Sequence, residues 1–312
     1  MKAVIVDPKQ AGRLVLGNAS PPRPAHSEAL VRVQAFSLNR GEVRMTRAPR
    51  PNWRPGWDLA GIVEKVAEDG SGPPVGARVV GMLRAGAWAE LAAVPIDALA
   101  AIPENVTFAQ AATLPVAGLT AYHALLKGGL LLGKNVLVTG ASGGVGEYAI
   151  QLGRLSGAAV TAHVRRPEQE AAAREAGAET VVVGETPADA KASGPFALMI
   201  DSVGGAVLGT LLGMVDEGTK VISLGTSAGN TVSFDAQKFY GIGMASLYGF
   251  ILFDELKTVE SAALGLARLA KLVGTGKLTP RISLEADWSY VDSVAQQLLD
   301  RAYPGKAVLM VG

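Results

Sequence analysis

Short runs of apolar, β-branched residues, separated by turns rich in glycine and proline, make up roughly the first 115 residues of the chain. Such a density of short strands and turns predicts a small, mostly β domain. The predicted strands are Lys2–Val6, Leu30–Phe36, Leu59–Val66, Arg78–Gly81 and Trp88–Val94.

The pattern changes at about Gly118, where predicted strands and helices begin to alternate. The strands lie near residues 136–139, 159–164, 180–183, 197–201 and 219–224. Helical segments such as Pro167–Ala176 and Val207–Val215 lie between them. This alternation is typical of βαβ units, so we expect an α/β fold with a doubly wound parallel sheet.

The segment after Leu252 carries a mixture of both patterns. An amphipathic helix is predicted over Ser261–Leu272, followed by a short strand at Ile282–Leu284. The residues Ser289-x-x-Asp292 have the spacing that opens a capped helix. A final strand is predicted over Ala307–Val311.

A glycine-rich turn, with glycines at 140, 143 and 146, follows the strand Val136–Thr139 and precedes a helical segment at Glu147–Leu155. Strand, glycine turn and helix are the parts of a dinucleotide-binding βαβ unit, in which a pyrophosphate binds amides at the helix N-terminus. Glycine is needed there because a Cβ would hold the phosphates away from the backbone. Ala141 replaces the first glycine of the strict fingerprint, and an ordinary tight turn is the alternative. The following strand, Ala158–Val164, favours the dinucleotide unit.

The end of that second strand indicates which dinucleotide is bound. An acidic residue at this place would contact the ribose 2′-hydroxyl of NAD, whereas the chain reads His163-Val164-Arg165-Arg166. The first carboxylate, Glu168, comes only after Pro167. Two guanidinium groups can bind a 2′-phosphate that a carboxylate would repel, so NADPH is the predicted cofactor. Two solvated arginines on a surface loop are the alternative.

Composition limits the remaining chemistry. The chain has 312 residues, 49% of them hydrophobic, which is enough for two domains with separate cores. A net charge of +1 gives no electrostatic indication of nucleic acid or anionic membrane as a partner. No apolar run of roughly 18 residues occurs, and Met1–Asp7 lacks the pattern of a signal peptide, so a cytoplasmic protein is expected. Without cysteine, disulfides, thiol nucleophiles and thiolate metal sites are excluded.

Several blocks along the chain resemble the zinc-independent, quinone oxidoreductase-like branch of the medium-chain dehydrogenase/reductase superfamily. They are Met1–Val6, Leu38–Gly41, Gly56–Gly61, Val75–Val79, Leu114–Tyr122 and Gly305–Lys306. The resemblance covers nearly the whole length. It implies a GroES-like, mostly β catalytic domain formed by residues 1–117 and 256–312, with a Rossmann NADPH-binding domain inserted at 118–255.

The same resemblance implies chemistry without a metal. Zinc-dependent relatives have Gly-His-Glu where this chain has Gly56-Trp57-Asp58, and they use cysteines that are absent here. Without a Lewis acid, simple alcohol oxidation is not expected. Hydride transfer from NADPH to a quinone or an α,β-unsaturated carbonyl (enone) fits better, because the charge of the product anion is delocalised.

Residue roles follow from the matching motifs. The resemblance places Thr120 at the nicotinamide ribose, Ser142, Gly143, Gly144, Val145 and Gly146 at the pyrophosphate, Arg165 and Arg166 at the 2′-phosphate, Gly225, Thr226 and Ser227 below the nicotinamide, Phe250 at its carboxamide, and Lys306 at the cofactor phosphates.

The substrate side of the site leaves more alternatives open. Asn39 is the candidate catalytic residue, orienting a substrate oxygen or a water, but it is equally suited to capping the next helical segment. Four aromatic residues, Trp53, Trp57, Tyr122 and Tyr248, are candidates for a flat slot that takes a quinone ring, although any one of them is more often plain core. Arginines 40, 44, 47, 50 and 54 form either a solvated loop or a handle for an anionic substrate such as coenzyme A.

Three functions therefore stay open at this stage: an NADPH-dependent quinone or enone reductase, an enoyl-thioester reductase of the fatty-acid or polyketide type, and a noncatalytic NADPH-binding protein. The first is favoured. The segment Met244–Leu252 resembles the edge strand through which relatives pair, so we also expect a homodimer.

Overall fold

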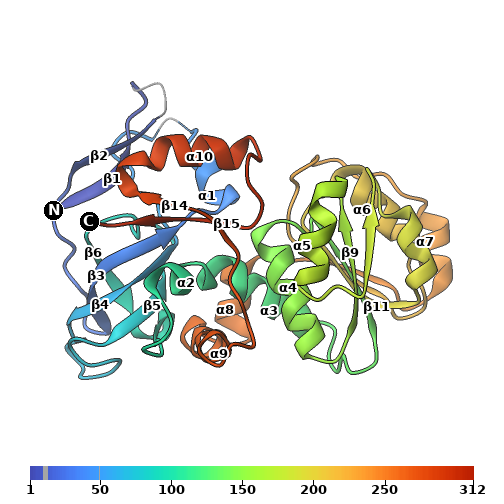
Figure 1. The fold of residues 1–312 in the computed structure, drawn as a ribbon, viewed down its shortest axis with the longest axis horizontal. Helices are drawn as coiled ribbons and strands as arrows, with labels where there is room; N and C mark the ends of the chain where they lie inside the picture. The colour runs from blue at the N-terminus through green and yellow to red at the C-terminus, as the bar shows by residue number, and fades with distance from the viewer. Residues whose placement is uncertain (10–12, 49) are drawn as a thin grey trace. The chain divides into compact units, whose positions relative to one another are not determined.

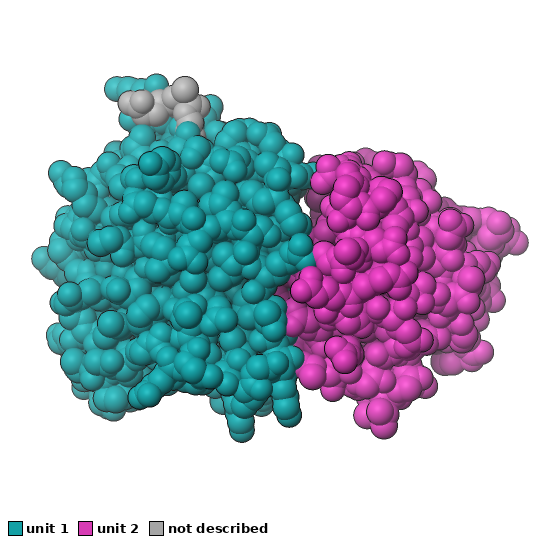
Figure 2. Space-filling model, in the orientation of Figure 1, with its two compact units in different colours: residues 1–119, 256–312 teal, residues 120–255 magenta. Residues whose placement is uncertain are grey.

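The computed structural model describes residues 1–9, 13–48 and 50–312. The chain divides into two compact units, coloured separately in Figure 2. Unit 1 comprises Met1–Leu119 and Leu256–Gly312, and unit 2 comprises Thr120–Glu255. The chain therefore leaves unit 1 within helix α3 (Leu119–Leu126) and returns to it within helix α8 (Leu252–Thr258). Among the described residues, no helix is both long and apolar enough to cross a membrane.

Unit 1 is built mainly of β-strands (Figure 1). Its strands are β1 (Lys2–Val6), β2 (Leu14–Asn18), β3 (Glu28–Ser37), β4 (Asp58–Lys65), β5 (Arg78–Met82), β6 (Leu91–Pro95), β7 (Leu99–Ala101), β14 (Ile282–Asp287) and β15 (Lys306–Met310). The main sheet has the order β14-β15-β3-β4-β5-β7, with β6 also paired to β3, while β1 and β2 form a separate antiparallel pair. Strand β15 thus brings the C-terminal segment beside β3 from the start of the chain.

Helices and short helical turns complete unit 1. They include α1 (Arg40–Met45), α2 (Phe108–Ala112), the π-helical turn Leu114–Gly118, α9 (Ala262–Gly274) and α10 (Val291–Leu299). Figure 1 shows α1 and α10 side by side. The Arg40 guanidinium joins them by donating to the last carbonyls of α10, at 3.2 Å from Leu298 O and 3.1 Å from Leu299 O. These bonds satisfy acceptors that the end of a helix leaves open.

Unit 2 is a parallel sheet with helices on both faces. Its strands are β8 (Asn135–Thr139), β9 (Ala159–Val164), β10 (Thr180–Val183), β11 (Phe196–Asp201), β12 (Lys220–Ser223) and β13 (Ser246–Gly249), in the order β10-β9-β8-β11-β12-β13. Its main helices are α4 (Gly144–Leu155), α5 (Glu170–Glu175), α6 (Gly205–Leu212) and α7 (Ala236–Ile242). Figure 1 shows α4 and α5 on one side of the sheet and α6 and α7 on the other. This is the doubly wound arrangement predicted from the sequence.

Two details differ from the sequence predictions. Strands β2 and β7 were not predicted, because each is short and its apolar run is interrupted or brief. The helix near residue 290 is also capped differently: Asp287, rather than Ser289, accepts a backbone hydrogen bond, from Ser289 N. A single turn over Trp288–Tyr290 then precedes α10, so the predicted Ser289-x-x-Asp292 capping pattern is wrong.

Candidate functional site

The glycine turn after β8 has the tight geometry of a phosphate-binding loop. Gly140 has φ +61°, and a Cβ there would lie 2.2 Å from Ser202 Oγ. A Cβ on Gly146 would lie 2.5 Å from the Gly140 carbonyl oxygen. Helix α4 therefore starts directly against the turn, and only glycine permits this approach.

The first turn of α4 is suited to an anion. Gly143 is the N-cap, and the first N–H groups of any helix have no partner within it. Their partial positive charge favours a pyrophosphate at this place. The turn also lies at the topological switch point, because the neighbours of β8 are β9 on one side and β11 on the other. Ligands of doubly wound folds bind at this point. The residues present fit a dinucleotide.

The loops after β8, β11 and β12 are fastened together at the carboxyl edge of the sheet. The buried Asp201 carboxylate accepts from Thr139 Oγ1 at 2.5 Å and from Gly204 N at 2.8 Å. Burial raises the pKa of Asp201, while these hydrogen bonds oppose the shift. A Cβ on Gly225 would lie 2.6 Å from Ser202 O, so the predicted Gly225–Ser227 loop packs against the loop after β11. Backbone contacts of this kind are not visible in a sequence.

The other predicted cofactor residues of unit 2 lie in different surroundings. Arg165 and Arg166 are exposed on the loop that follows β9. Phe250 is buried directly after β13, and its N–H donates to Ser223 O at 2.9 Å. Thr120 is buried in α3. Just before the two arginines, His163 is buried with its Nε2 2.8 Å from Gly184 O, and burial lowers its pKa, which favours a neutral ring.

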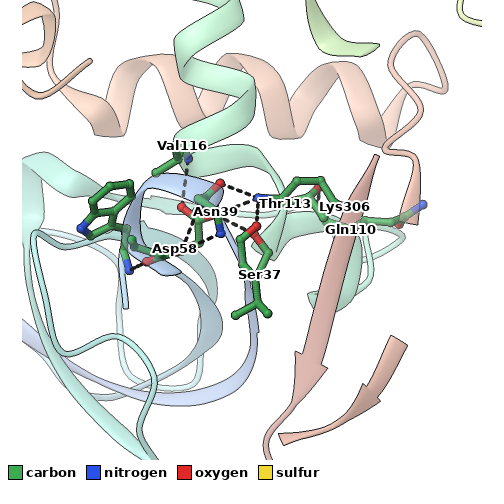
Figure 3. Close-up of polar contacts among 10 residues, drawn as sticks. Ser37, Asn39, Asp58, Gln110, Thr113, Val116 and Lys306 are labelled. Carbon is green, nitrogen blue, oxygen red and sulfur yellow. Dashed lines mark hydrogen bonds and ion pairs between the residues drawn. The ribbon is translucent and has the colours of Figure 1, made fainter. Parts of the chain in front are cut away.

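A buried network of charged and amide groups lies within unit 1 (Figure 3). Asp58 Oδ2 accepts from Ser37 Oγ at 2.6 Å and from Asn39 Nδ2 at 2.7 Å, and it lies 3.5 Å from Lys306 Nζ. Its other oxygen accepts from Val116 N at 3.0 Å, in the π-helical turn. Asp58 thus joins strand β4 to the segment that leads into unit 2. Asp58 belongs to the predicted Gly56–Gly61 motif, but this role was not predicted from the sequence.

Lys306 is the cation of this network. Its ammonium group donates to Leu38 O at 2.8 Å and to Asn39 Oδ1 at 2.6 Å, in addition to its contact with Asp58. Burial lowers the pKa of Lys306, although the nearby carboxylates of Asp58 and Glu42 oppose the shift. Three buried oxygens surround this ammonium group. The structure therefore does not support the predicted contact of Lys306 with cofactor phosphates.

Both polar atoms of the Asn39 side chain form hydrogen bonds within the same network. Its Nδ2 donates to Asp58 and, at 2.9 Å, to Glu42 Oε1, while its Oδ1 accepts from Lys306. Its backbone N–H also donates to Glu42 Oε1 at 2.8 Å, in the manner of a capping box at the start of α1. Burial, and then the charge of Asp58, raise the pKa of Glu42 well above its usual range. Both amide hydrogens are in use, so the structure favours the capping alternative for Asn39.

The candidate aromatic residues have local partners within their own units. Trp53 packs against the core of unit 1, with the Arg50 guanidinium 5.5 Å from its ring centroid. In unit 2, Tyr122 lies edge-on to His123 with 5.3 Å between the ring centroids. Tyr248, on β13, donates its hydroxyl to Glu255 at 2.5 Å. No aromatic slot is defined within either unit by these contacts.

Two residues of the arginine-rich segment make hydrogen bonds within unit 1. Arg40 caps α10 as described above, and Arg47 donates to Gln296 Oε1 at 2.6 Å. These contacts favour a structural role over a substrate handle. Within residues 1–9, 13–48 and 50–312, no group of three or more His, Cys, Asp or Glu side chains is placed to hold a metal ion.

Comparison with known families agrees with this architecture. Residues 25–104 match the alcohol dehydrogenase GroES-like domain, and residues 144–268 match the family described as zinc-binding dehydrogenase. These matches confirm the predicted combination of a GroES-like domain with a Rossmann-type domain.

Individual proteins are similar along most of the chain. A chloroplast envelope quinone oxidoreductase homolog of Arabidopsis thaliana is 30% identical over 308 residues, covering 92% of this chain and 91% of the relative. An acryloyl-coenzyme A reductase of Sulfurisphaera tokodaii is 26% identical over 346 residues, covering 99% of each. A mycobacterial structure complexed with NADPH superposes with a TM-score of 0.87 at 26% identity, covering 99% of this chain and 100% of that one.

Proposed function

Because the chain belongs to the medium-chain dehydrogenase/reductase superfamily, in its quinone oxidoreductase-like branch, we propose that it is an NADPH-dependent oxidoreductase that transfers hydride to a quinone or an enone without a metal. The observation that carries the proposal is the dinucleotide turn of unit 2, followed one strand later by Arg165 and Arg166. A carboxylate that would repel a 2′-phosphate does not occur at the end of β9.

When bound, the nicotinamide supplies the hydride, and the protein contributes binding and orientation. The N–H groups at Ser142–Gly146 bind the pyrophosphate, and the two guanidinium groups bind the 2′-phosphate. The Gly225–Ser227 loop and Phe250 are proposed to lie against the nicotinamide. Hydrogen bonds to Asp201 and close backbone packing hold the loops after β8, β11 and β12 together. This surface is therefore formed before the cofactor binds.

The substrate class follows from charge. Hydride addition to a simple ketone makes a localised alkoxide, which a metal or a strong acid normally stabilises. A chain without cysteine lacks the ligands of a conventional dehydrogenase zinc site. Addition to a quinone or an enone spreads the negative charge over a conjugated system, so backbone amides and water suffice.

Turnover with NADPH deuterated at the transferred position tests this proposal. The assay uses protein that has been dialysed against a strong chelator. The deuterium should appear on the β-carbon of the reduced enone. Comparable turnover of saturated ketones, with the label on the carbinol carbon, would assign the protein to the carbonyl reductases instead. Loss of turnover that stoichiometric zinc restores would disprove the metal-free reaction.

A second candidate is an enoyl-thioester reductase. The similarity to an acryloyl-coenzyme A reductase along 99% of both chains favours it. Both candidates reduce a conjugated alkene, so a panel of 1,4-quinones, simple enones and enoyl-coenzyme A thioesters separates them by kcat/KM. We also propose a homodimer that pairs through β13, one of the two outer strands of the unit 2 sheet.

A further inference from the structure

The side chain of Gln169 connects two loops of unit 2 that the proposed cofactor site uses. Gln169 lies at the end of the short helical turn Pro167–Gln169, just after the two arginines. Its Oε1 accepts from Arg165 N at 3.2 Å and from Arg166 N at 3.0 Å. Its Nε2 donates to Ser142 Oγ in the glycine turn, at 2.9 Å.

These contacts have the arrangement of an anion site occupied by a neutral group. Two successive backbone N–H groups donate to one oxygen atom, and successive backbone N–H groups that converge on one point can also bind an anion. A neutral amide oxygen is a weak occupant, because hydrogen bonds to a charged acceptor are shorter and about twice as strong. The guanidinium groups of Arg165 and Arg166 are exposed at the same loop. An anion in place of the amide oxygen would therefore accept the two backbone hydrogen bonds more strongly. It would also be attracted by the two guanidinium groups.

A capping role alone does not account for the full set of contacts. A capping box needs one bond from the third residue to the N-cap N–H, and the bond from Arg166 N fulfils it. The bond from Arg165 N and the bond to Ser142 are additional. The second of these reaches the turn proposed to hold the pyrophosphate. Gln169 is thus placed between the proposed positions of the pyrophosphate and the adenosine ribose.

We propose that Gln169 is a specificity-determining residue, which occupies the 2′-phosphate subsite in the free protein and is displaced when NADPH binds. The inference rests on the proposed function, since it assumes that unit 2 binds a nicotinamide dinucleotide. A carboxylate at position 169 would hold the same two N–H groups more strongly and repel the 2′-phosphate. The side chain at position 169 therefore acts together with Arg165 and Arg166 in setting the preference between NADPH and NADH.

Equilibrium binding of two adenosine fragments to the full-length protein tests the proposal. Adenosine 2′,5′-bisphosphate and 5′-AMP differ only in the 2′-phosphate, and calorimetry measures each Kd without turnover. Gln169→Glu should weaken the bisphosphate about tenfold or more, while 5′-AMP changes by no more than about twofold. Gln169→Ala should bind the bisphosphate as tightly as the wild type or more tightly, because no internal group has to leave. Ala171→Glu adds the same charge on the exposed side of α5 and should leave both ligands unchanged.

Each other outcome has a definite meaning. Equal weakening of both fragments by Gln169→Ala would reduce the residue to a structural cap and overturn the inference. Weakening of the bisphosphate alone by Gln169→Ala would make Gln169 a direct phosphate ligand and overturn its displacement. An unchanged ratio of the two Kd values in Gln169→Glu would overturn the specificity role, while NADPH binding by the same samples keeps the proposed function. Failure of the wild type to bind NADPH or NADH would overturn both.

Discussion

The Asp58 carboxylate and the Lys306 ammonium lie 3.5 Å apart inside unit 1, although 248 positions separate them in the sequence. Strand β4 supplies the first residue and strand β15 the second, and β3 lies between these strands in the sheet. The whole of unit 2 is inserted between them in the chain. The pair therefore links the C-terminal segment of unit 1 to its N-terminal segment.

Replacing Lys306 by methionine should lower the free energy of unfolding of unit 1 by about 3–5 kcal/mol, because two buried acidic groups lose their cation. All four tryptophans lie in unit 1, so urea unfolding followed by their fluorescence reports on this unit. Lys65→Met is the matched control, since Lys65 is exposed on β4 of the same sheet. A loss for Lys306→Met as small as that of the control would show that the network does not stabilise the fold.

The sequence predicted the alternation of strands in unit 2 well, because runs such as 159–164 and 180–183 are continuous, apolar and bounded by turns. It also predicted the glycine turn, whose requirement for small residues is local. The network around Asp58 was not predicted, because its members come from distant segments and meet only when β15 pairs with β3. For the same reason Lys306 was assigned to the cofactor, although its ammonium is enclosed by oxygens of unit 1. Local patterns predict elements, while contacts between distant side chains require the topology.

Alanine at Gly146 should abolish tight dinucleotide binding. The new Cβ would lie 2.5 Å from Gly140 O and 2.6 Å from Ala141 Cα, and neither backbone atom can move without opening the turn. We expect the Kd for NADPH to rise about tenfold or more, which corresponds to roughly 1.4 kcal/mol. Titration followed by NADPH fluorescence measures it. Gly241→Ala is the control, because a Cβ there meets nothing within 4 Å. Equal affinity of the two variants would contradict a phosphate-binding role for this turn.

A lysine at Leu247 should dissociate the proposed dimer. Leu247 lies on β13, at the end of the sheet order, and is 46% exposed, and Met244, just before the strand, is 75% exposed. An apolar outer strand of this kind is an aggregation hazard unless it is covered, and a second copy related by a twofold axis would cover both edges. Light scattering should give twice the 32.1 kDa chain mass for the wild type and the single mass for Leu247→Lys. Leu264→Lys, on the exposed side of α9, should stay dimeric. A wild-type protein that is monomeric at all concentrations would rule the dimer out.

The ion pair between Lys127 and Glu255 should make unit 2 sensitive to acid. Lys127 Nζ lies 2.6 Å from Glu255 Oε2, and the Tyr248 hydroxyl donates to the other oxygen at 2.5 Å. Burial opposes ionisation of Glu255, but the bonds from Lys127 and Tyr248 outweigh it and hold the pKa of Glu255 below its usual value of 4.5. A carboxyl whose pKa is lower in the folded state stabilises the fold above its unfolded pKa. That contribution is lost as the pH falls through the folded pKa.

Glu255→Gln tests this sign directly. At neutral pH we expect the variant to be less stable by about 1–3 kcal/mol, because Lys127 loses its charged partner in a largely buried position. The difference should stay constant down to about pH 5 and shrink below the usual glutamate pKa, where the wild-type carboxylate becomes protonated. Hydrogen exchange of amides in unit 2 measures the local free energy of opening. Glu179→Gln removes an exposed carboxylate of the same unit and should change stability by less than about 0.5 kcal/mol at every pH. A difference between Glu255→Gln and the wild type that grows on acidification would mean that burial, rather than the ion pair, determines the titration of Glu255.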